Sequence, residues 1–468
     1  MARHPFSSVN LISDPIHGYV ELTKRLTDAQ SAEAGLPTER VAEEALLDTA
    51  WLQRMRRISQ LQSARWVFPT AEHSRFTHGL GVMHEAGLWG RSLYPSLSGE
   101  LARTDDGAPS EGLVVETLRV AGLLHDVGHG PFAHFFDDHV LARFAAPADP
   151  RRPAGKRLSH EDLSQLIIER ELGSVIEGLR RAPGTVPDRD AFADGERIDP
   201  RWVSFLVSKP ALAGDGMPAW VRWLQPLLSG VFTVDNLDYV RRDAHMTGVA
   251  TDVDVERLRR YAFIGPRGLT LFEPGLGALE QFLNARLFLY QQVYFHRTVR
   301  AIDLDLAEVF GPSIQAMFGA ASPVDQLSAY ADLDEYALLH QAARWARGES
   351  VASSPVDGDG CVTPLVADGW RAILLRQPRW RSEAEVRAEY EAGNRPDDLI
   401  AALGEPRPGH VVIDVATIDA RPADATATDS LLALEARDGS SPSLARALGR
   451  IPAYATIARR YRRLDARG

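Results

Sequence analysis

The sequence predicts a mainly α fold, with a helical core followed by a smaller α+β region near the C-terminus. Apolar residues recur at spacings of three and four through most of the first 316 residues, a pattern typical of helices that bury one face. The apolar runs that predict strands, Val411 to Val415 and Tyr454 to Ile457, lie late in the chain. We therefore expect a helical core at residues 1–316 and an α+β region at 317–468 that packs on this core.

Seven segments carry the helical spacing, and stretches rich in Pro, Gly and Asp separate them. The predicted helices cover 38–63, 76–96, 111–127, 160–181, 218–245, 254–263 and 275–316. The predicted loops cover 102–110, 145–158 and 182–200.

The C-terminal part combines a polar excursion with two apolar runs. Residues Gly348 to Gly360 are rich in Ser, Pro, Asp and Gly, which predicts a loop. Val411 to Val415 is β-branched and nearly all apolar, and Tyr454 to Ile457 is a shorter apolar run. These runs predict a small sheet packed with helices.

Composition favours a cytoplasmic enzyme that does not cross a membrane. The single cysteine, Cys361, excludes an intrachain disulfide and suggests a reducing compartment. No stretch reaches the roughly 18 apolar residues of a membrane span, and the N-terminus lacks the apolar segment of a signal peptide. The formal charge of −11 does not attract polyanions, and no long basic stripe with interleaved aromatics is present. Duplex nucleic acid is therefore an unlikely substrate, and a phosphate ligand must be held by local charge.

Histidines concentrate in one part of the chain. Seven of the fourteen fall between residues 73 and 139. Within this stretch, the adjacent His125 and Asp126 offer an imidazole nitrogen and a carboxylate oxygen to one divalent cation. An apolar helix precedes the pair, and Pro131 predicts that this helix ends nearby. His129 and His134 should therefore lie at or just past the helix end, close to the metal.

Two further segments complete a ligand set. His78 follows an arginine in the segment Arg75-Phe76-Thr77-His78, and Asp235 lies in a much later acidic segment. Two histidines and two aspartates make a mixed nitrogen and oxygen site without thiolates. Such a site suits one divalent ion such as Mn, Fe, Co, Ni or Zn, and on a six-coordinate ion it leaves positions for water and substrate.

The order of these motifs resembles the HD-domain metal-dependent phosphohydrolases, and more narrowly the deoxynucleoside triphosphate triphosphohydrolases. The resemblance covers roughly residues 12 to 310, and more faintly Val411 to Val415. It is carried by Asp14–Gly18, Gln53–Arg56, Val67–Pro69, Arg75–His78, His125–His134, His160-Glu161, Asp238-Tyr239, Arg242-Asp243 and Val293–Arg297. It implies an HD-domain helical core, one divalent metal ion (Mg is a further candidate), and hydrolysis of dNTPs to deoxynucleoside and tripolyphosphate.

General acid chemistry is assigned to residues near the ligands. His134 and His129 are the candidates to protonate the leaving ribose 5′-oxygen, and Asp137 can orient one imidazole through its second nitrogen. His160 and Glu161 resemble a further active-site pair of the family, in which Glu161 would fix the tautomer of His160.

The resemblance also implies residues that contact the sugar and the phosphates. Gln60, Leu61 and Asp243 match positions that bind the 3′-hydroxyl, and Tyr294 matches an aromatic wall that excludes a 2′-hydroxyl. Tyr239 would hydrogen-bond phosphate. Arg75, Arg286 and Arg297 match positions that contact phosphate or nucleotide, whereas Arg241 and Arg242 are equally well explained as ordinary ion pairs.

One departure from the family leaves the substrate open. The residue after the metal aspartate is usually basic, and here it is Asn236. A phosphohydrolase acting on nucleoside monophosphates or on a specialised phosphorylated metabolite, or a nucleotide sensor of low activity, therefore stays as an alternative.

A regulatory site is also implied by the resemblance. Asp48, Gln53 and Arg56 are spaced like residues that hold an activating guanine base between subunits, and Arg257 resembles a second nucleotide contact. Two differences stand against it: Ser13 replaces a frequent Asn, and Gly268 to Phe272 lacks basic residues. We expect a homo-oligomer, a tetramer, whose activity rises with GTP or dGTP.

Overall fold

The computed structural model describes residues 8–29, 32, 41–104, 107–148, 155–184, 186–208, 216–349, 360–391, 396–421 and 430–464. It is 52% helical and 15% strand. The mainly α fold class is therefore confirmed. Among the described residues, none of the helices combines the length and hydropathy that a bilayer span needs. The predicted excursion from 348 to 360 lies mostly outside the described residues.

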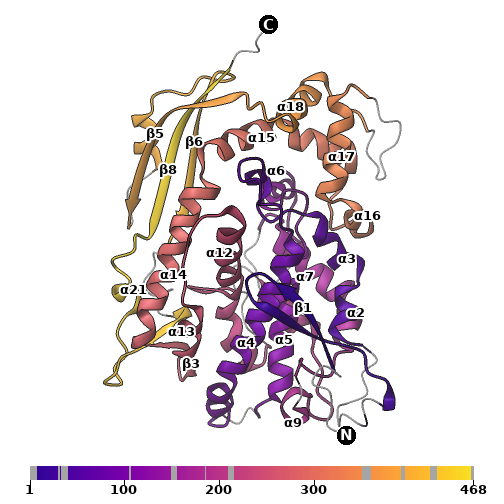
Figure 1. Ribbon diagram of the computed structural model, residues 1–468, viewed down its shortest axis with the longest axis vertical. Coiled ribbons are helices and arrows are strands. Elements are labelled where there is room, and N and C mark those ends of the chain that lie inside the picture. Colours follow the sequence, from indigo (N-terminus) through magenta and orange to yellow (C-terminus); the bar gives the residue numbers. More distant parts are fainter. Residues whose placement is uncertain are drawn as a thin grey trace.

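Two antiparallel helices pack against each other in the lower half of the molecule as drawn in Figure 1. They are α4 (Arg75–Leu101) and α5 (Glu111–Leu124), and they pack closely because glycines lie between them. A Cβ at Gly122 would lie 2.9 Å from the carbonyl oxygen of Val82, so only glycine allows this approach. Ser110 caps α5 by accepting a hydrogen bond from the backbone of Leu113.

Short elements precede this pair of helices, and they include a β-hairpin that was not predicted. β1 (Val9–Asp14) and β2 (Gly18–Thr23) form an antiparallel hairpin. In the described part of the predicted helix from 38 to 63, the chain instead forms short helical segments, because Thr49 is extended and caps a new helix and Ile58 is extended as well. These segments are α2 (Glu43–Leu47), α3 (Ala50–Arg54), η1 (Met55–Arg57) and η2 (Gln62–Trp66).

Further helices surround α4 and α5. The first group is α6 (His134–His139), η3 (Leu141–Arg143), α7 (His160–Arg170), α8 (Gly173–Ile176), α9 (Pro187–Asp190) and α10 (Pro200–Val207). The second is α11 (Ala219–Leu224), η4 (Gln225–Leu227), α12 (Val234–Thr247), α13 (Val255–Arg260), η5 (Glu273–Gly275) and α14 (Leu276–Leu289). The predicted helix at 254–263 ends early, because Ala262 and Phe263 belong to the hairpin of β3 (Ala262–Gly265) and β4 (Gly268–Phe272).

The long segment predicted at 275–316 is also divided. After α14 the chain forms one π-helical segment, η6 (Tyr290–Tyr294), and then α15 (Arg297–Phe318) begins after His296, whose side chain caps it. Single π turns inside helices are frequent at functional sites.

The C-terminal region contains helices and strands, as predicted. The helices are α16 (Leu327–Asp332), α17 (Glu335–Ala346), α18 (Pro364–Leu374), α19 (Pro396–Ala402) and α21 (Leu444–Ala447). The strands are β5 (Trp380–Tyr390), β6 (Val411–Asp419), β7 (Ala433–Glu435) and β8 (Tyr454–Arg463). Both apolar runs lie in the sheet β5-β8-β6, which packs beside α15 (Figure 1), so the predicted small sheet packed with helices is present. Within it, Val411 to Val415 pair with residues 458–462 of β8.

A second sheet joins the C-terminal region to the core. β7 pairs in parallel with β4, so the sheet β3-β4-β7 contains strands from both predicted regions. The division at residue 316 stays a prediction.

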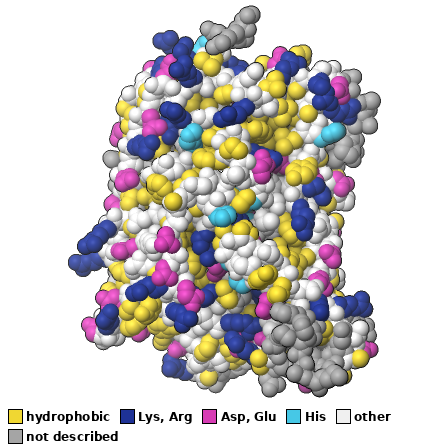
Figure 2. Space-filling view, viewed as in Figure 1, with side chains coloured by type: hydrophobic (Ala, Val, Ile, Leu, Met, Phe, Trp, Pro, Cys, Tyr) yellow, Lys and Arg dark blue, Asp and Glu magenta, His cyan; other side chains and the backbone are white. Residues whose placement is uncertain are grey.

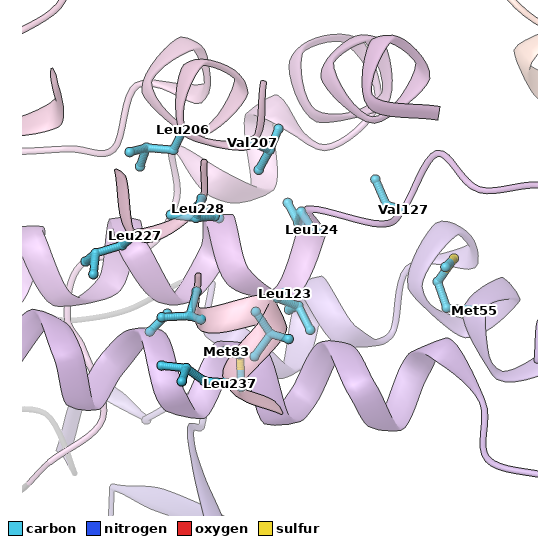
Figure 3. Close-up of a cluster of buried hydrophobic side chains, with 14 of the residues drawn as sticks. Met55, Met83, Leu123, Leu124, Val127, Leu206, Val207, Leu227, Leu228 and Leu237 are labelled. Atoms are coloured by element: carbon cyan, nitrogen blue, oxygen red, sulfur yellow. The ribbon is translucent and has the colours of Figure 1, made fainter. Parts of the chain in front are cut away.

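The main hydrophobic core lies where α4, α5 and α12 meet. Met83, Leu123 and Leu237, one from each helix, are buried there (Figure 3). Burial of side chains of this size contributes about 1.5–3 kcal/mol each. This core therefore fixes the relative positions of the three helices.

Candidate metal centre and active site

Each predicted metal ligand lies at or near a helix end. His78 is in the first turn of α4, His125 is the C-cap of α5 and precedes Asp126, and Asp235 is in the first turn of α12. Thr233 caps α12 by accepting a hydrogen bond from the backbone of Asn236. Leu123 and Leu237, which lie two residues from His125 and Asp235, anchor these ends in the core (Figure 3).

The four side chains converge on one point. Asp235 Oδ1 lies 3.2 Å from His78 Nε2 and 3.7 Å from His125 Nε2. Asp126 Oδ1 lies 3.3 Å from His125 Nε2, and its Oδ2 lies 4.0 Å from His78 Nε2. The geometry thus brings together all four residues that the sequence singled out.

The donor chemistry fits a divalent cation. His78 Nδ1 bonds Asp238 at 2.8 Å and His125 Nδ1 bonds the carbonyl oxygen of Gly122 at 2.8 Å. With Nδ1 protonated, each ring presents its Nε2 lone pair to the centre. Among the described residues, neither buried Nε2 atom has a hydrogen-bond partner. Buried polar atoms of this kind are costly unless something binds them, and a metal ion would satisfy both.

The electric field at this point also favours a cation. Burial alone would lower the pKa of His78, but the carboxylates of Asp235 and Asp238 raise it to about 9. Burial would raise the pKa of Asp126, but His125 and Arg75 hold it well below its usual range. The centre therefore carries carboxylate charge that a divalent ion can neutralise.

A buried network that the sequence did not predict supports His78. Asp238 accepts from His78 through Oδ2 and contacts His17 Nε2 through Oδ1 at 2.6 Å. Arg242 donates to both oxygens of Asp238 and, at 2.8 Å, to Asp14. Gly81 makes room for this network, because a Cβ there would lie 2.0 Å from Asp238. The turn after β1 is thus connected to a candidate metal ligand.

We expect Asp238→Asn to weaken metal binding by about 10–100-fold, because the variant loses the charge that orients His78 and raises its basicity. The affinity for Mn²⁺, measured by titration calorimetry, checks this. Asp14→Asn is the matched control, since Asp14 contacts the same arginine but not His78. Equal loss of affinity in both variants would show that Asp238 acts only through general stability.

A second cluster follows the first along the chain. His129, His134, Asp137 and His160 have side-chain ligand atoms within 4.8 Å of one another. The rings of His129 and His160 stack with centroids 3.6 Å apart, and His129 Nε2 lies 3.4 Å from Asp126 Oδ1. The two clusters are therefore contiguous.

Protonation states within the second cluster differ. Burial opposes charge on His160, yet Asp137 and Glu161 raise its pKa to about 9. Burial, Arg75 and His160 instead lower the pKa of His129 well below its usual value. Asp137 contacts His160 Nδ1 closely, whereas Glu161 lies 3.4 Å from the other ring nitrogen. Asp137 is therefore the closer partner that fixes this ring.

His134 is the exposed member of the second cluster. Its side chain is 64% exposed, and its Nδ1 lies 3.5 Å from Asp137 Oδ2. Phe132 and Ala133, which precede it, both have positive φ, at 59° and 48°. Non-glycine residues in this region cost free energy and cluster at functional sites. The strained turn directs His134 away from the core.

One cavity of about 380 Å³ connects these clusters with the predicted sugar residues. From the two clusters, its lining includes Asp126, Asp235, His134 and His160, together with Arg75 and Glu161, which contact them. From the predicted sugar and phosphate set it includes Gln60, Leu61, Tyr239, Asp243 and Tyr294. Cavities of this size are typical of small-molecule sites.

The sugar residues contact one another. Tyr294 donates to Asp243 Oδ2 in a close contact, and Asp243 Oδ1 bonds His73 at 2.8 Å. The Oε1 atom of Gln60 is buried and, within the described part of the chain, has no partner. A ligand hydroxyl is one group that would satisfy it.

The arginines that were predicted to contact phosphate lie in different environments. Arg75 lines the cavity and contacts Asp126, whereas Arg286 is not among the described lining residues and donates to the Tyr239 hydroxyl at 2.9 Å. Arg297 is an exposed residue at the start of α15. Arg242 is buried against Asp238, and Arg241 contacts Glu85, so both make ion pairs.

The predicted regulatory residues lie on the surface. Asp48 and Arg56 are exposed, and Gln53 donates to the carbonyl oxygen of Leu47 at 2.9 Å. Arg56 donates to Gln53 at 2.9 Å, so these residues are neighbours. Arg257 lies on α13 and donates to the carbonyl oxygen of Pro274.

Sequence reasoning missed part of the cavity lining. Ser63 from η2, Tyr290 from η6, and Arg300 and Asp303 from α15 all line it. Each lies close in sequence to a predicted residue, but none belongs to a motif through which the chain resembles the family.

Comparison with known proteins identifies an HD domain and several relatives. Residues 75–182 match the HD domain family. The deoxynucleoside triphosphate triphosphohydrolase SAMHD1 of Homo sapiens is 28% identical over 315 residues, which are 65% of this chain and 44% of that protein. The Bos taurus enzyme is 27% identical over 314 residues, with 65% and 47% covered. The chain thus spans about half the length of these relatives. The uncharacterized protein YwfO of Bacillus subtilis is 26% identical over 364 residues, with 74% and 69% covered.

Solved structures share the fold over nearly the whole chain. A hypothetical protein from Aquifex aeolicus superposes with a TM-score of 0.66 at 22% identity, covering 97% of this chain and 96% of that one. A phosphohydrolase from Bacteroides thetaiotaomicron gives 0.62 at 20% identity, covering 97% and 100%. Residues 75–182 thus match the HD domain family, and the chain is similar to deoxynucleoside triphosphate triphosphohydrolases at 27–28% identity over 65% of its length.

Proposed function

We propose that this protein hydrolyses dNTPs to deoxynucleoside and tripolyphosphate with the help of one divalent metal ion. The observation that carries the proposal is the shared cavity, which is lined by metal-ligand candidates, a histidine cluster and a sugar-sized polar set. The similarity to dNTP triphosphohydrolases supports the choice of substrate. The identity of the metal and a cytoplasmic location remain predictions.

At the phosphate end, His78, His125, Asp126 and Asp235 would hold the ion. A divalent ion supplies Lewis-acid stabilisation of the charge that develops on the phosphoryl oxygens. Arg75 lies in the same part of the cavity and offers guanidinium donors to a phosphate. Tyr239 has a hydroxyl that accepts from Arg286, so its own proton is left to donate to phosphate.

The leaving 5′-oxygen requires a proton. His134 is exposed to the cavity, and Asp137 contacts both His134 and His160. The charged His160 can return a proton to the pair His134 and Asp137. The neutral ring of His129 stacks on the ring of His160. We assign the donation to His134 because it is the accessible ring.

At the sugar end, Gln60 and Asp243 provide the hydrogen-bonding groups for a 3′-hydroxyl. Tyr294 is held against Asp243, so its ring is a fixed wall. A 2′-hydroxyl facing this wall would lose its hydration without a partner.

Asn236 favours a second candidate function. A neutral residue beside Asp235 neutralises a polyphosphate tail less well than a base would. A nucleoside monophosphate or a specialised phosphorylated metabolite would need no such charge. A nucleotide sensor of low activity would likewise bind without rapid turnover.

One assay separates these functions. The protein is incubated with dNTPs, NTPs and dNMPs in the presence of Mn²⁺ or Mg²⁺, and nucleoside and phosphate products are resolved by chromatography. Deoxynucleoside with tripolyphosphate supports the proposal. Formation of dNMP with pyrophosphate, or turnover of dNMPs alone, contradicts it.

We expect Tyr294→Ala to admit ribonucleotides, because removal of the ring opens space for a 2′-hydroxyl. The ratio of kcat/KM for dATP over ATP should fall by about tenfold or more. Tyr294→Phe is the matched control, since it keeps the wall and loses only the bond to Asp243. An unchanged ratio in Tyr294→Ala would place sugar selection elsewhere.

We also propose regulation through Asp48, Gln53, Arg56 and Arg257. GTP or dGTP bound there would stabilise a homotetramer and raise activity through linkage. Activity and sedimentation should both respond to GTP in the wild type, and Asp48→Ala should lose both responses. An undiminished response in this variant, or none in the wild type, would remove the guanine site.

A further inference from the structure

A polar cluster lies in the cavity outside the metal centre and the sugar residues. Ser63 donates to Asp303 Oδ1 in a close contact, and Arg300 Nη1 donates to Asp303 Oδ2 at 3.3 Å. All three residues line the cavity, and they come from η2 and α15 rather than from the helices that carry the metal ligands.

The cluster is held rigidly. Arg300 donates through Nε and Nη2 to Asp414 of β6, at 2.9 and 2.5 Å. This two-point contact fixes the plane of the guanidinium. Asp414 belongs to strand β6 of the C-terminal sheet and is not among the described residues that line the cavity. The fixed groups are therefore preorganised.

Asp303 retains unused hydrogen-bonding capacity. A carboxylate has about four acceptor positions, and the two contacts occupy one position on each oxygen. The side chain is only 15% exposed, and burial raises its pKa. Additional donors from a ligand would stabilise the charged form of this buried carboxylate.

The surroundings suit a planar ring. Tyr290 and Tyr294 line the same cavity, and their rings lie 4.6 Å apart in an edge-to-face arrangement. Aromatic faces of this kind stack on any nucleobase, whereas hydrogen-bonding groups at the ring edge distinguish one base from another. The cavity thus offers both elements of base recognition.

We propose that Ser63, Arg300 and Asp303 form the nucleobase subsite and favour guanine. The inference rests on the proposed function, in which the phosphates lie at the metal centre. Guanine presents N1–H and an exocyclic amine side by side, which match the free acceptor positions of Asp303. Its O6 and N7 acceptors match the guanidinium of Arg300.

A purely structural role predicts a different outcome. If the cluster only ties α15 to β6, Asp303 matters through stability and not through the base. Asp305 provides the comparison, because it is also a carboxylate of α15 paired with an arginine, Arg379. Asp305 is not among the described residues that line the cavity.

The test compares dGTP with dITP, which lacks only the exocyclic 2-amino group. GTP is kept at one saturating concentration in all reactions, so that activation does not differ between substrates. The wild type should prefer dGTP in kcat/KM by about 10–100-fold, the size expected for hydrogen bonds to a charged group. Asp303→Asn should bring the ratio close to one, and Asp305→Asn should keep the wild-type ratio.

The outcomes separate this inference from the proposed function. Equal kcat/KM for dGTP and dITP in the wild type, or an equal loss of preference in both variants, overturns the base subsite while dNTP hydrolysis stands. If the wild type hydrolyses none of the dNTPs, the proposed function fails. Calorimetric binding of dGTP and dITP to the same proteins then decides the subsite, and equal affinities overturn it.

Discussion

Asp126→Ala and Asp235→Asn are expected to abolish hydrolysis and to remove the bound metal ion. Both carboxylates lie within 4 Å of the ligand nitrogens of the two histidines, so each loss breaks the donor set. Losing several kcal/mol of transition-state stabilisation should reduce kcat by about a thousandfold or more. Metal content by mass spectrometry and kcat for dATP check the two effects separately.

The two variants differ in what else they disturb. Asp126→Ala also frees Arg75, whereas Asp235→Asn keeps the shape of the side chain. Circular dichroism should show both variants folded, because the core of α4, α5 and α12 is unchanged. Asp332→Asn, an exposed change on α16, is the control and should retain full metal content. Full metal occupancy in Asp235→Asn would contradict the assignment of this ligand.

The candidate ligands were predictable because their signal is local. Adjacent His125 and Asp126 are a weak signal alone, but together with the motifs around His78 and Asp235, which follow in a recognisable order, they predict a metal site. The structure then brings three helix ends together. On the face that Figure 2 shows, basic and acidic side chains are interspersed.

Strands were harder to predict than helices. β5 reads Trp380-Arg-Ser-Glu-Ala-Glu-Val-Arg-Ala-Glu-Tyr390 and is largely exposed, so it lacks the apolar alternation that predicts a strand. Cross-strand ion pairs such as Glu385 with Arg459 hold it on β8. The interruption between α14 and α15 at η6 could not be predicted, because the apolar helical spacing continues through Tyr290 and Val293.

Long-range polar contacts could not be predicted from spacing. His17 and Asp238 are 221 residues apart, and Ser63 and Asp303 are 240 apart. Their pairing depends on how helices pack, which in turn depends on positions such as Gly81, where any Cβ would collide with Asp238. The candidate metal centre could therefore be predicted from the sequence, but the polar network around Asp238 and the cavity wall formed by Ser63 and Asp303 could not.

His134→Ala is expected to lower kcat for dNTPs by about 10²–10⁴-fold with little change in metal content or stability. The ring is 64% exposed and contacts the histidine cluster rather than the core, so its loss leaves no cavity in the apolar interior. The stated range is the usual contribution of a general acid. Kinetics on dATP, with metal content and thermal unfolding measured on the same samples, check the prediction.

A substrate with a better leaving group identifies the step that His134 assists. Hydrolysis of 4-nitrophenyl triphosphate releases an anion that departs without a proton, so His134→Ala should slow it far less than dATP. His160→Ala is the comparison, because His160 shares the Asp137 contact but is buried. Equal losses on both substrates in His134→Ala would mean that the ring binds phosphate instead of donating a proton. A large loss in His160→Ala beside a small one in His134→Ala would transfer the acid role to His160, whose pKa of about 9 keeps it protonated at neutral pH.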